Sequence, residues 1–225
     1  MALYIVATPI GNLEDITLRA LRMLKEVDLI ACEDTRQTKK LLTHYDIHKP
    51  LTSYYQHSKL EKVELLLTWL KEGKNIALVT DSGTPGISDP GFVIINRAIE
   101  EGIEVIPLPG PSALITAVIA SGLPANGFVF WGFLPRKKGK IKKELWKAAQ
   151  AGKTIIVYES PFRLLATLKI ISETLVDCEV AVARELTKKF EEIIRGKVTE
   201  VMEKIKDRQI KGEIVIVISP LAGKN

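Results

Sequence analysis

The chain of 225 residues is poor in cysteine and histidine and contains no long apolar run. Its two cysteines, Cys32 and Cys178, lie far apart and form no CxxC pair, which excludes a disulfide scaffold and predicts reduced thiols in a cytoplasmic protein. No apolar run reaches the roughly 20 residues that a membrane-spanning helix needs. The first residues have no basic leader before an apolar stretch, so we expect neither a signal peptide nor a membrane partner.

Several common nucleotide and catalytic motifs are also missing. No GxGxxG pattern follows an apolar strand, and no GxSxG elbow is present, which excludes a Rossmann fingerprint and a hydrolase nucleophile turn. Residues 151–154 (Ala-Gly-Lys-Thr) resemble the end of a phosphate-binding loop, but Lys147 stands where that loop needs its first glycine. The histidines His44, His48 and His57 have no cysteine or carboxylate set that completes a zinc site, so we expect no metal.

The net charge of +5 is unevenly distributed. Residues 1–118 carry 12 lysines and arginines against 15 acidic residues, whereas residues 119–225 carry 20 against 12. A basic second half favours an anionic partner, with nucleic acid the first candidate, although a solvated lysine-rich surface has the same composition.

The first half alternates short apolar runs with helical patterns. Apolar residues at consecutive positions are typical of strands covered on both faces, and the spacing of apolar residues between them predicts helices. This alternation predicts an α/β domain with a mainly parallel sheet over residues 1–118. The predicted strands are 3–7, 29–32, 76–80 and 104–108, and the helical patterns fall within 16–24, 63–70 and 93–99.

The second half, residues 119–225, predicts another α/β domain. Two of its strands have only a short connection, so we expect a mixed sheet. A cluster of turn formers at 121–127 indicates the boundary between the domains. The predicted strands are 129–133, 154–158, 179–183, 192–195 and 213–219, with helical patterns near 140–151, 161–174 and 199–209.

Three loops rich in glycine and proline follow first-half strands, at 8–15, 81–91 and 109–113. Ligands of open parallel sheets bind beyond the carboxyl ends of the strands. Any one of these loops alone is best explained as a tight turn, but three at one edge predict a ligand site.

A set of motifs along the whole chain resembles one known superfamily. They lie at 4–15, 32–36 (Cys-Glu-Asp-Thr-Arg), 81–91, 107–113, 131–136, 158–164 and 184–192. Together they are similar to the tetrapyrrole methylases, which use S-adenosyl-L-methionine. The loop at 81–91 and the segment at 184–192 resemble the branch that methylates the ribose 2′-hydroxyl of a cytidine in 16S ribosomal RNA.

The resemblance implies two α/β domains with the cofactor in the cleft between them. It also implies a homodimer that acts on 16S rRNA or on the small ribosomal subunit. S-adenosyl-L-methionine needs an apolar slot for its adenine and a few placed polar groups. The residues that the resemblance implies for cofactor binding are Pro9, Ile10, Gly11, Asp81, Gly83, Ile87, Ser112, Ala113, Tyr158, Glu185 and Pro220.

Methyl transfer to a hydroxyl requires alignment of the acceptor oxygen and a group that accepts its proton or stabilises the alkoxide. The candidate catalytic residues are Glu33, Asp34, Arg36, Glu185 and Lys188. A salt-bridge network made of the same side chains is the alternative interpretation.

A basic run after Phe133 is the candidate RNA-binding segment, because lysine and arginine neutralise phosphates without reading sequence. We expect it to leave the rim of the site as a loop and to enter a helix. Trp131 and Phe133 are favoured as core side chains over base-stacking ones. The run contains Arg136, Lys137, Lys138, Lys140, Lys142 and Lys143.

Two other functions remain open at this point. A tetrapyrrole C-methyltransferase acts on a polycarboxylate, which positive charge also suits. A module that binds RNA without chemistry would need no S-adenosyl-L-methionine.

Overall fold

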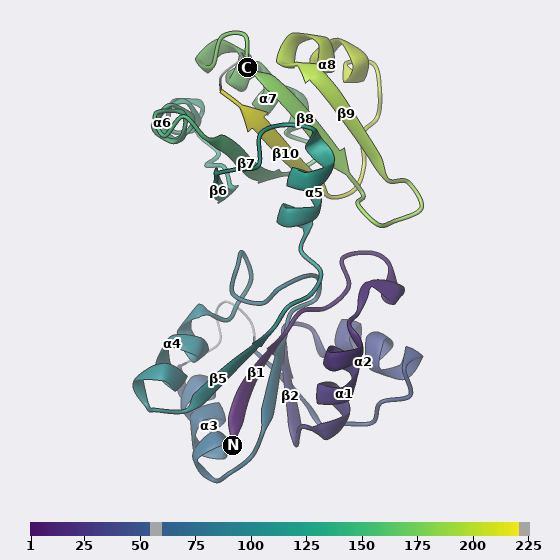
Figure 1. Cartoon of the computed structure of the whole chain (residues 1–225), viewed down its shortest axis with the longest axis vertical. Coiled ribbons are helices and arrows are strands. Elements are labelled where there is room, and N and C mark those ends of the chain that lie inside the picture. The colour runs from purple at the N-terminus through teal and green to yellow at the C-terminus, as the bar shows by residue number, and fades with distance from the viewer. Residues whose placement is uncertain (55–59, 221–225) are drawn as a thin grey trace. The chain divides into compact units, whose positions relative to one another are not determined.

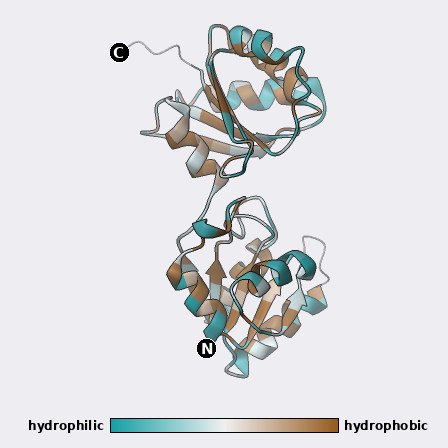
Figure 2. Ribbon diagram, turned by 90° about the vertical axis from the view of Figure 1, so that its right-hand side faces the viewer, coloured by the Kyte–Doolittle hydropathy of each residue, from teal (hydrophilic) through white to brown (hydrophobic). Residues whose placement is uncertain are grey.

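The computed structural model describes residues 1–54 and 60–220 and divides the chain into two compact units, Met1–Ser112 and Ala113–Asn225 (Figure 1). Each unit has its own five-stranded sheet and its own hydrophobic core. Strands are the most consistently apolar elements, whereas the helices carry hydrophilic residues on their outer faces (Figure 2). In the described part of the chain, no helix has the length and apolarity to cross a membrane.

The sheet of the N-terminal unit is entirely parallel and has the order β3-β2-β4-β1-β5. This confirms the mainly parallel sheet expected from the consecutive apolar runs, which are buried because helices cover both faces. The strands are β1 (Ala2–Val6), β2 (Leu29–Cys32), β3 (Leu51–Ser53), β4 (Ile76–Val79) and β5 (Glu104–Leu108).

Two helices cover each face of this sheet. A short 3₁₀ turn, η1 (Leu13–Asp15), precedes α1. Helices α1 and α2 pack through Leu24, Leu41 and Leu42 on one face, and α3 and α4 pack through Leu67 and Ile94 on the other. Right-handed crossovers produce this division, because the chain moves one way across the sheet to β3 and then the other way. The helices are α1 (Leu18–Glu26), α2 (Thr35–His44), α3 (Leu60–Lys71) and α4 (Phe92–Glu100).

The sheet of the C-terminal unit is mixed, as expected, and has the order β6-β7-β10-β8-β9. Among the described strands, β6 and β7 pair in parallel, and the pairs β7–β10, β10–β8 and β8–β9 are antiparallel. The strands are β6 (Phe128–Phe133), β7 (Thr154–Glu159), β8 (Glu179–Arg184), β9 (Glu192–Lys197) and β10 (Ile214–Ser219).

Within residues 113–220, the C-terminal unit has the helices α5 (Ala113–Ser121), α6 (Lys138–Ala149), α7 (Leu164–Thr174) and α8 (Val198–Ile205). The last three share one core with alternate residues of the strands. Helix α5 contacts β8, β9 and β10, and Arg195 of β9 donates to the backbone carbonyls of Ala120 and Ser121 at its end. A cation there satisfies carbonyls that a helix leaves unpaired.

The unit boundary between Ser112 and Ala113 lies before the one expected at residue 118. The reason is α5, whose packing against β8 to β10 places it wholly in the C-terminal unit. The turn formers at 121–127 follow this helix and do not separate the units. Sequence patterns also missed β3, whose three residues are only partly buried, and α2, whose ten residues carry few apolar positions.

A buried carboxylate organises the loop from which α6 begins. Glu159 lies at the end of β7 with its side chain fully buried, and it accepts hydrogen bonds from the Thr167 hydroxyl at 2.6 Å and the Ser160 N–H at 2.8 Å. Arg163 lies 3.4 Å from Glu159 and donates to the carbonyls of Leu134 and Pro135. The motif at 158–164 therefore holds the start of the basic run in place.

Candidate functional site

The carboxyl ends of the N-terminal strands bring the predicted loops together. Thr8 and Gly83 exchange two backbone hydrogen bonds of 2.9 and 3.0 Å, which join the loop after β1 to the loop after β4. The Thr8 hydroxyl is buried and donates to the Thr80 carbonyl at 3.0 Å. The Thr84 hydroxyl donates to the Pro111 carbonyl at 3.1 Å, which adds the loop after β5. The prediction that these three loops meet is confirmed.

Two glycines permit this close packing. Gly83 has a φ of +87°, where other residues are strained, and a Cβ there would lie 3.4 Å from Ile10. A Cβ on Gly110 would lie 2.8 Å from the Cβ of Ala7, which is closer than real contacts allow. A side chain at position 110 would push the loops apart, whereas one at position 83 would strain the backbone.

The segments that follow β2 and β4 place carboxylates between the ends of these two strands. These strands are neighbours, but the chain leaves β2 toward β3 and leaves β4 toward β5, in opposite directions across the sheet. Such a switch point opens a crevice at the strand ends, where ligands of α/β proteins bind. Glu33 and Asp34 follow β2, and Thr80 and Asp81 follow β4.

Hydrogen bonds across this crevice fix two of the carboxylates. The Thr80 hydroxyl donates to Glu33 at 2.9 Å, and the Asp34 N–H donates to Asp81 at 3.0 Å. Burial raises the pKa of Asp81, and the nearby charges of Glu33 and Asp34 add to that effect. The Asp81 side chain therefore combines a fixed position with reduced acidity.

Asp34 begins α2 and is tied to Arg36. Its carboxylate accepts the Arg36 N–H at 2.8 Å and the Arg36 guanidinium at 2.7 Å. These hydrogen bonds lower the pKa of Asp34 to about 2. A carboxylate that acidic is a poor proton acceptor, so Asp34 caps the helix and holds Arg36.

Asp89 is a member of this cluster that the sequence analysis did not single out. It lies in the loop before α4 and shares the Thr80 hydroxyl with Glu33. Burial and the charge of Glu33 raise the pKa of Asp89 to about 6. Its position eight residues after Asp81 in the same loop was the available signal. Asp89 is the carboxylate best matched to proton transfer near neutral pH.

The remaining N-terminal residues proposed for cofactor binding lie at the same edge. Pro9, Ile10 and Gly11 follow the Thr8–Gly83 pair, with Ile10 buried and Gly11 exposed. Ile87 exposes 48% of its surface in the loop after β4, and so adds apolar area to this polar edge. Ser112 ends the N-terminal unit and Ala113 begins α5 of the other unit.

Glu185 and Lys188 lie in the C-terminal unit, in the connection after β8. The Lys188 ammonium lies 3.1 Å from Glu185 and 3.0 Å from Glu213. Glu185 also accepts the Glu213 N–H at 2.9 Å. Although burial opposes it, these bonds lower the pKa of Glu185, and the two carboxylates raise the pKa of Lys188. Within this unit both side chains are engaged in a salt-bridge network.

The C-terminal sheet separates Pro220 from the other two proposed cofactor residues of this unit. Tyr158 pairs with Val215 and Arg184 pairs with Ile214, so Tyr158 and Glu185 lie near the start of β10. Pro220 follows Ser219 at the other end of that six-residue strand, about 20 Å away at the usual rise per residue. The structure therefore does not bring these three residues together.

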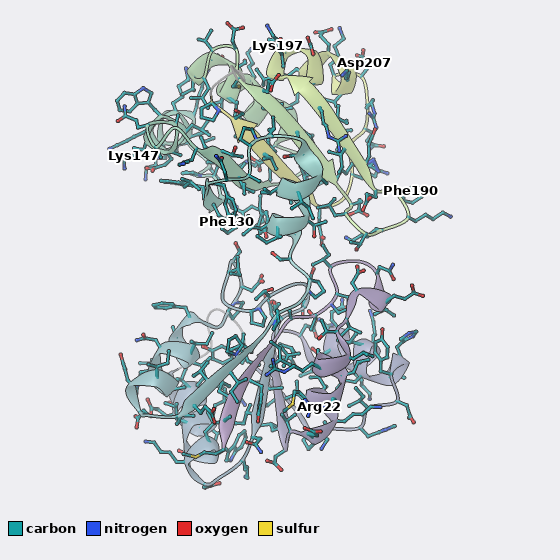
Figure 3. The ribbon with its side chains drawn as sticks, in the orientation of Figure 1. Arg22, Phe130, Lys147, Phe190, Lys197 and Asp207 are labelled. Atoms are coloured by element: carbon teal, nitrogen blue, oxygen red, sulfur yellow. The ribbon has the colours of Figure 1, made fainter. Side chains whose placement is uncertain are left out.

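The basic run lies mainly on the first turns of α6, which begins earlier than the helical pattern near 140–151 indicated. Lys138 and Lys142 form ion pairs of 3.0 and 2.9 Å with Glu173 of α7. Their hydrogen bonds lower the pKa of Glu173 to about 2. The other members, Arg136, Lys137, Lys140 and Lys143, are exposed and form no ion pair with a described residue. Further along α6, Lys147 projects outward (Figure 3).

The two aromatic side chains of β6 differ. Trp131 packs against the core, as expected, but Phe133 exposes 63% of its surface, so its placement in the core was wrong. A bulge between Phe130 and Gly132 changes the register of β6 against β7 and is the local cause. Phe133 instead lies against Tyr158, with 5.6 Å between ring centroids.

No group of three or more histidine, cysteine, aspartate or glutamate side chains is placed to hold a metal ion within residues 1–54 and 60–220. His57 lies outside the described residues.

Comparison with known proteins identifies the family. Residues 2–202 match the family described as Tetrapyrrole (Corrin/Porphyrin) Methylases. The chain belongs to the tetrapyrrole methylase family. This methyltransferase is 53% identical to the Ribosomal RNA small subunit methyltransferase I of Bacillus subtilis, over 96% of the chain and 74% of that protein. It is 51% identical to the protein of that name from Hydrogenobaculum, over 97% and 96% of the two chains.

Solved structures of similar fold are also methyltransferases. A cobalt precorrin-4 methyltransferase matches 97% of this chain and 94% of its own, with a TM-score of 0.72 and 19% identity. A uroporphyrin-III-C-methyltransferase from Thermus thermophilus matches with a TM-score of 0.62 and 19% identity. At this identity the likeness confirms the two-unit α/β fold of the methyltransferase and leaves its substrate open.

The raised pKa of Asp89 predicts a pH dependence of stability. Between about pH 4 and pH 6 the folded state keeps a proton that the unfolded state has released, so the free energy of unfolding falls as pH rises. Asp89→Asn removes this decline. Because Asp89 is only partly buried, solvent screens part of this effect, and at pH 8 we expect the variant to be more stable than the parent by about 1 to 2 kcal/mol, with little difference at pH 4. Urea unfolding at both pH values measures this.

The control is Asp15→Asn, at an exposed aspartate of the same unit. It should change stability equally at both pH values. An Asp89→Asn variant that follows the parent across this range contradicts the raised pKa.

Proposed function

We propose that this methyltransferase transfers a methyl group from S-adenosyl-L-methionine to the ribose 2′-hydroxyl of a cytidine in 16S ribosomal RNA. The observation that carries the proposal is the identity of about half of all residues, over nearly the whole chain, with proteins named Ribosomal RNA small subunit methyltransferase I. The identity of the nucleotide and of the acceptor oxygen comes from the sequence resemblance, and the acidic edge of the N-terminal sheet supports it.

The edge of the N-terminal sheet suits the cofactor. The exposed Ile87 side chain and the Asp81 carboxylate present the mixture of apolar surface and placed polar groups that such a ligand needs. The hydrogen bonds between Thr8 and Gly83 hold together the loops at this edge. Glycines at 83 and 110 let the loops that form this edge lie close to one another. S-adenosyl-L-methionine supplies the methyl group when bound.

The acceptor hydroxyl must lose its proton as its oxygen forms the new C–O bond and the C–S bond breaks. Glu33 and Asp89, which share the Thr80 hydroxyl, are the groups proposed to accept that proton. The pKa of Asp89, about 6, is close to the pH at which proton transfer is efficient, which favours this role. Arg36, which is held by Asp34 and exposes 86% of its side chain, is proposed to contact a phosphate of the substrate.

The unpaired cations of α6 are proposed to hold RNA. Lys137 begins the helix and Lys140 lies in its first turn, where no acidic side chain offsets the helix dipole. Cations at the N-terminus of a helix are repelled by the helix dipole, and a bound phosphate offsets this repulsion. Lys138 and Lys142, which pair with Glu173, are less available than the sequence suggested.

Tritiated S-adenosyl-L-methionine tests the function directly. With isolated small ribosomal subunits or 16S rRNA as acceptor, we expect tritium in the RNA, and nuclease mapping should find one cytidine that resists alkaline cleavage at its 3′ side. Label on a base, or transfer to a tetrapyrrole in place of RNA, would contradict the proposal. Binding of RNA without binding of the cofactor would indicate a module without chemistry.

Asp81→Ala should weaken cofactor binding by tenfold or more, because a hydrogen bond to a charged group contributes about 1.5 to 3 kcal/mol. Calorimetry with S-adenosyl-L-methionine measures the affinity. The melting temperature of the free protein should change little, because Asp81 is only partly buried and lies at the edge of the sheet. Asp28→Ala is the matched control. Asp28 also accepts one backbone N–H, that of Asn75 at 2.8 Å, but lies where β2 begins, at the opposite edge of the sheet. Equal losses of affinity in both variants would refute the placement of the cofactor.

Replacing Lys137, Lys140 and Lys143 with glutamine should weaken RNA binding and leave cofactor affinity intact. Each lost phosphate contact lowers the slope of log affinity against log salt by about 0.7 on single strands, so three contacts lower it by about 2. A filter-binding series from low to high salt measures the slope. The control replaces three exposed lysines on other elements of the same unit, Lys169, Lys206 and Lys211. If both triple variants keep the parent's slope, this end of α6 does not bind RNA.

A further inference from the structure

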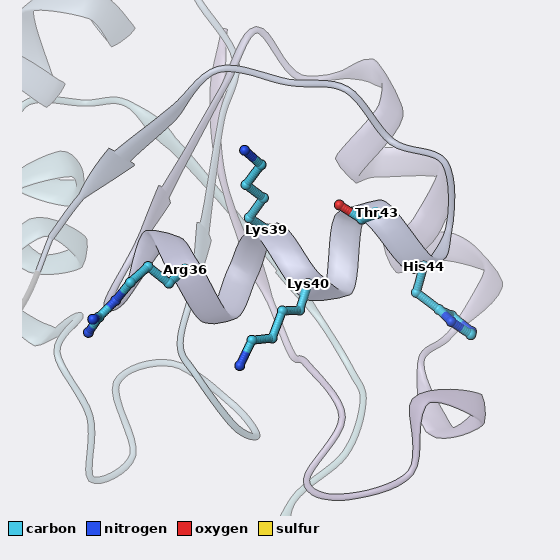
Figure 4. A pocket seen from close by; sticks show the side chains of 5 residues that line it. All are labelled: Arg36, Lys39, Lys40, Thr43 and His44. Carbon is cyan, nitrogen blue, oxygen red and sulfur yellow. The ribbon is translucent and has the colours of Figure 1, made fainter.

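The outer face of α2 is an open, basic hollow of about 590 Å³ lined by Arg36, Lys39, Lys40, Thr43 and His44. We call these five residues the α2 face. Arg36 and His44 lie toward opposite ends of the helix, and Lys39 and Lys40 project to opposite sides between them (Figure 4). The helix buries Thr38, Leu41 and Leu42 on its other side, so the helical repeat places the basic residues together on the exposed side.

The α2 face differs in charge from other helices of the same unit. Helix α1 joins Arg22 to Glu26, and α4 joins Arg97 to Glu100 and Glu101. Helix α2 contains no acidic residue, and no ion pair connects Lys39 or Lys40 to a carboxylate of residues 1–54 or 60–220. The Lys40 ammonium donates a hydrogen bond to the neutral Gln37 amide oxygen, at 3.1 Å. Like charges four residues apart repel each other, so Arg36 and Lys40 weaken the isolated helix.

This cationic face stands on the acidic half of the chain, next to the carboxylate crevice. Asp34 caps α2 and donates its N–H to Asp81, so the first turn of the helix is fixed to the edge where the reaction is proposed to occur. Glu33, Asp81 and Asp89 there would repel a polyanion. Cations on the adjoining helix offset that repulsion for a substrate that extends away from the crevice.

We propose that the α2 face binds the phosphate backbone of the RNA on the strand that continues from the methylated nucleotide; this proposal rests on the proposed function. Arg36 and His44 are eight residues apart, about 12 Å along the helix. That length is enough for the α2 face to contact more than one phosphate of a nucleotide strand. The face carries no apolar side chain to insert into lipid and no acidic residue to pair with a basic protein, so an extended polyanion is the ligand that its chemistry fits.

The test replaces Lys39 and Lys40 with glutamine and leaves Arg36, which belongs to the proposed catalytic machinery, in place. The matched control is Lys25→Gln with Lys74→Gln. It removes the same charge from exposed lysines of the same unit, at the edge where β2 and β4 begin. Binding of 16S rRNA is measured against salt concentration without cofactor, and methyl transfer to small subunits is measured separately.

We expect the Lys39/Lys40 variant to lower the salt slope by about 1.4 on single-stranded RNA, from two contacts of about 0.7 each. The control should keep the parent's slope, and both variants should bind S-adenosyl-L-methionine like the parent. Equal slopes for the variant and the parent overturn the proposal, as does an equal decrease in the control. Loss of binding to vesicles of anionic lipid, with RNA binding unchanged, assigns the face to a membrane and also overturns it.

The two readouts keep this proposal distinct from the proposed function. If the parent transfers no methyl group to RNA, the proposed function fails, whereas the salt slopes still decide whether the α2 face binds RNA. If the parent methylates RNA and the slopes are equal, only the α2 face is refuted.

Discussion

Two backbone hydrogen bonds between Thr8 and Gly83 join the first and fourth strands beyond the end of the sheet, and the candidate site is built on that connection. A parallel sheet ends all its strands at one edge, where the loops must satisfy backbone groups that no further strand can reach. Here the backbone groups of the loops bond to each other. The Thr8 hydroxyl adds a hydrogen bond to the Thr80 carbonyl, and the Thr84 hydroxyl adds one to the Pro111 carbonyl. The result is an edge whose loops are held in position by their own hydrogen bonds, so that a ligand need not order them when it binds.

The carboxylates around that edge differ in their pKa values. The crevice between β2 and β4 gathers carboxylates around the single hydroxyl proton of Thr80, which donates to one acceptor at a time. Burial and the charge of Glu33 raise the pKa of Asp89 to about 6, although its hydrogen bond to Thr80 opposes the rise, whereas the hydrogen bonds to Arg36 lower the pKa of Asp34 to about 2. Two aspartates of one cluster thereby acquire different roles, one as a proton acceptor and the other as a helix cap.

The sequence predicted most of the framework, because apolar runs and helical spacing report burial. Strand β3 was not predicted, because its three residues form a strand through pairing with β2 and not through a pattern of their own. Helix α5 was not assigned to the C-terminal unit from sequence, because that assignment depends on contacts with β8 to β10, which are distant in sequence. The exposure of Phe133 depends on the bulge in β6, a feature that no local pattern encodes.

Within the site, sequence motifs located the loops but not the environment of each side chain. Asp81 and Asp89 stand in one loop and look alike in sequence; only the fold shows that Asp89 faces Glu33 across Thr80. Pro220 and Tyr158 are the opposite case, because the antiparallel direction of β10 places the two residues at opposite ends of the sheet. Strand direction follows from long-range pairing, which a single sequence does not reveal.

The segment after β8 shows how a motif of charged residues becomes structural. Glu185 and Thr187 both have positive φ, at 50° and 65°, which is unfavourable for residues with side chains. Such a conformation persists when the surroundings determine it: Glu185 is held by the Glu213 N–H and by Lys188, and its side chain occupies the space that a Cβ on Gly212 would need. A carboxylate with that many fixed partners cannot readily turn to accept a proton. The proton-accepting role in the proposed reaction is therefore better assigned to Glu33 and Asp89, whose shared partner is a hydroxyl able to change its acceptor.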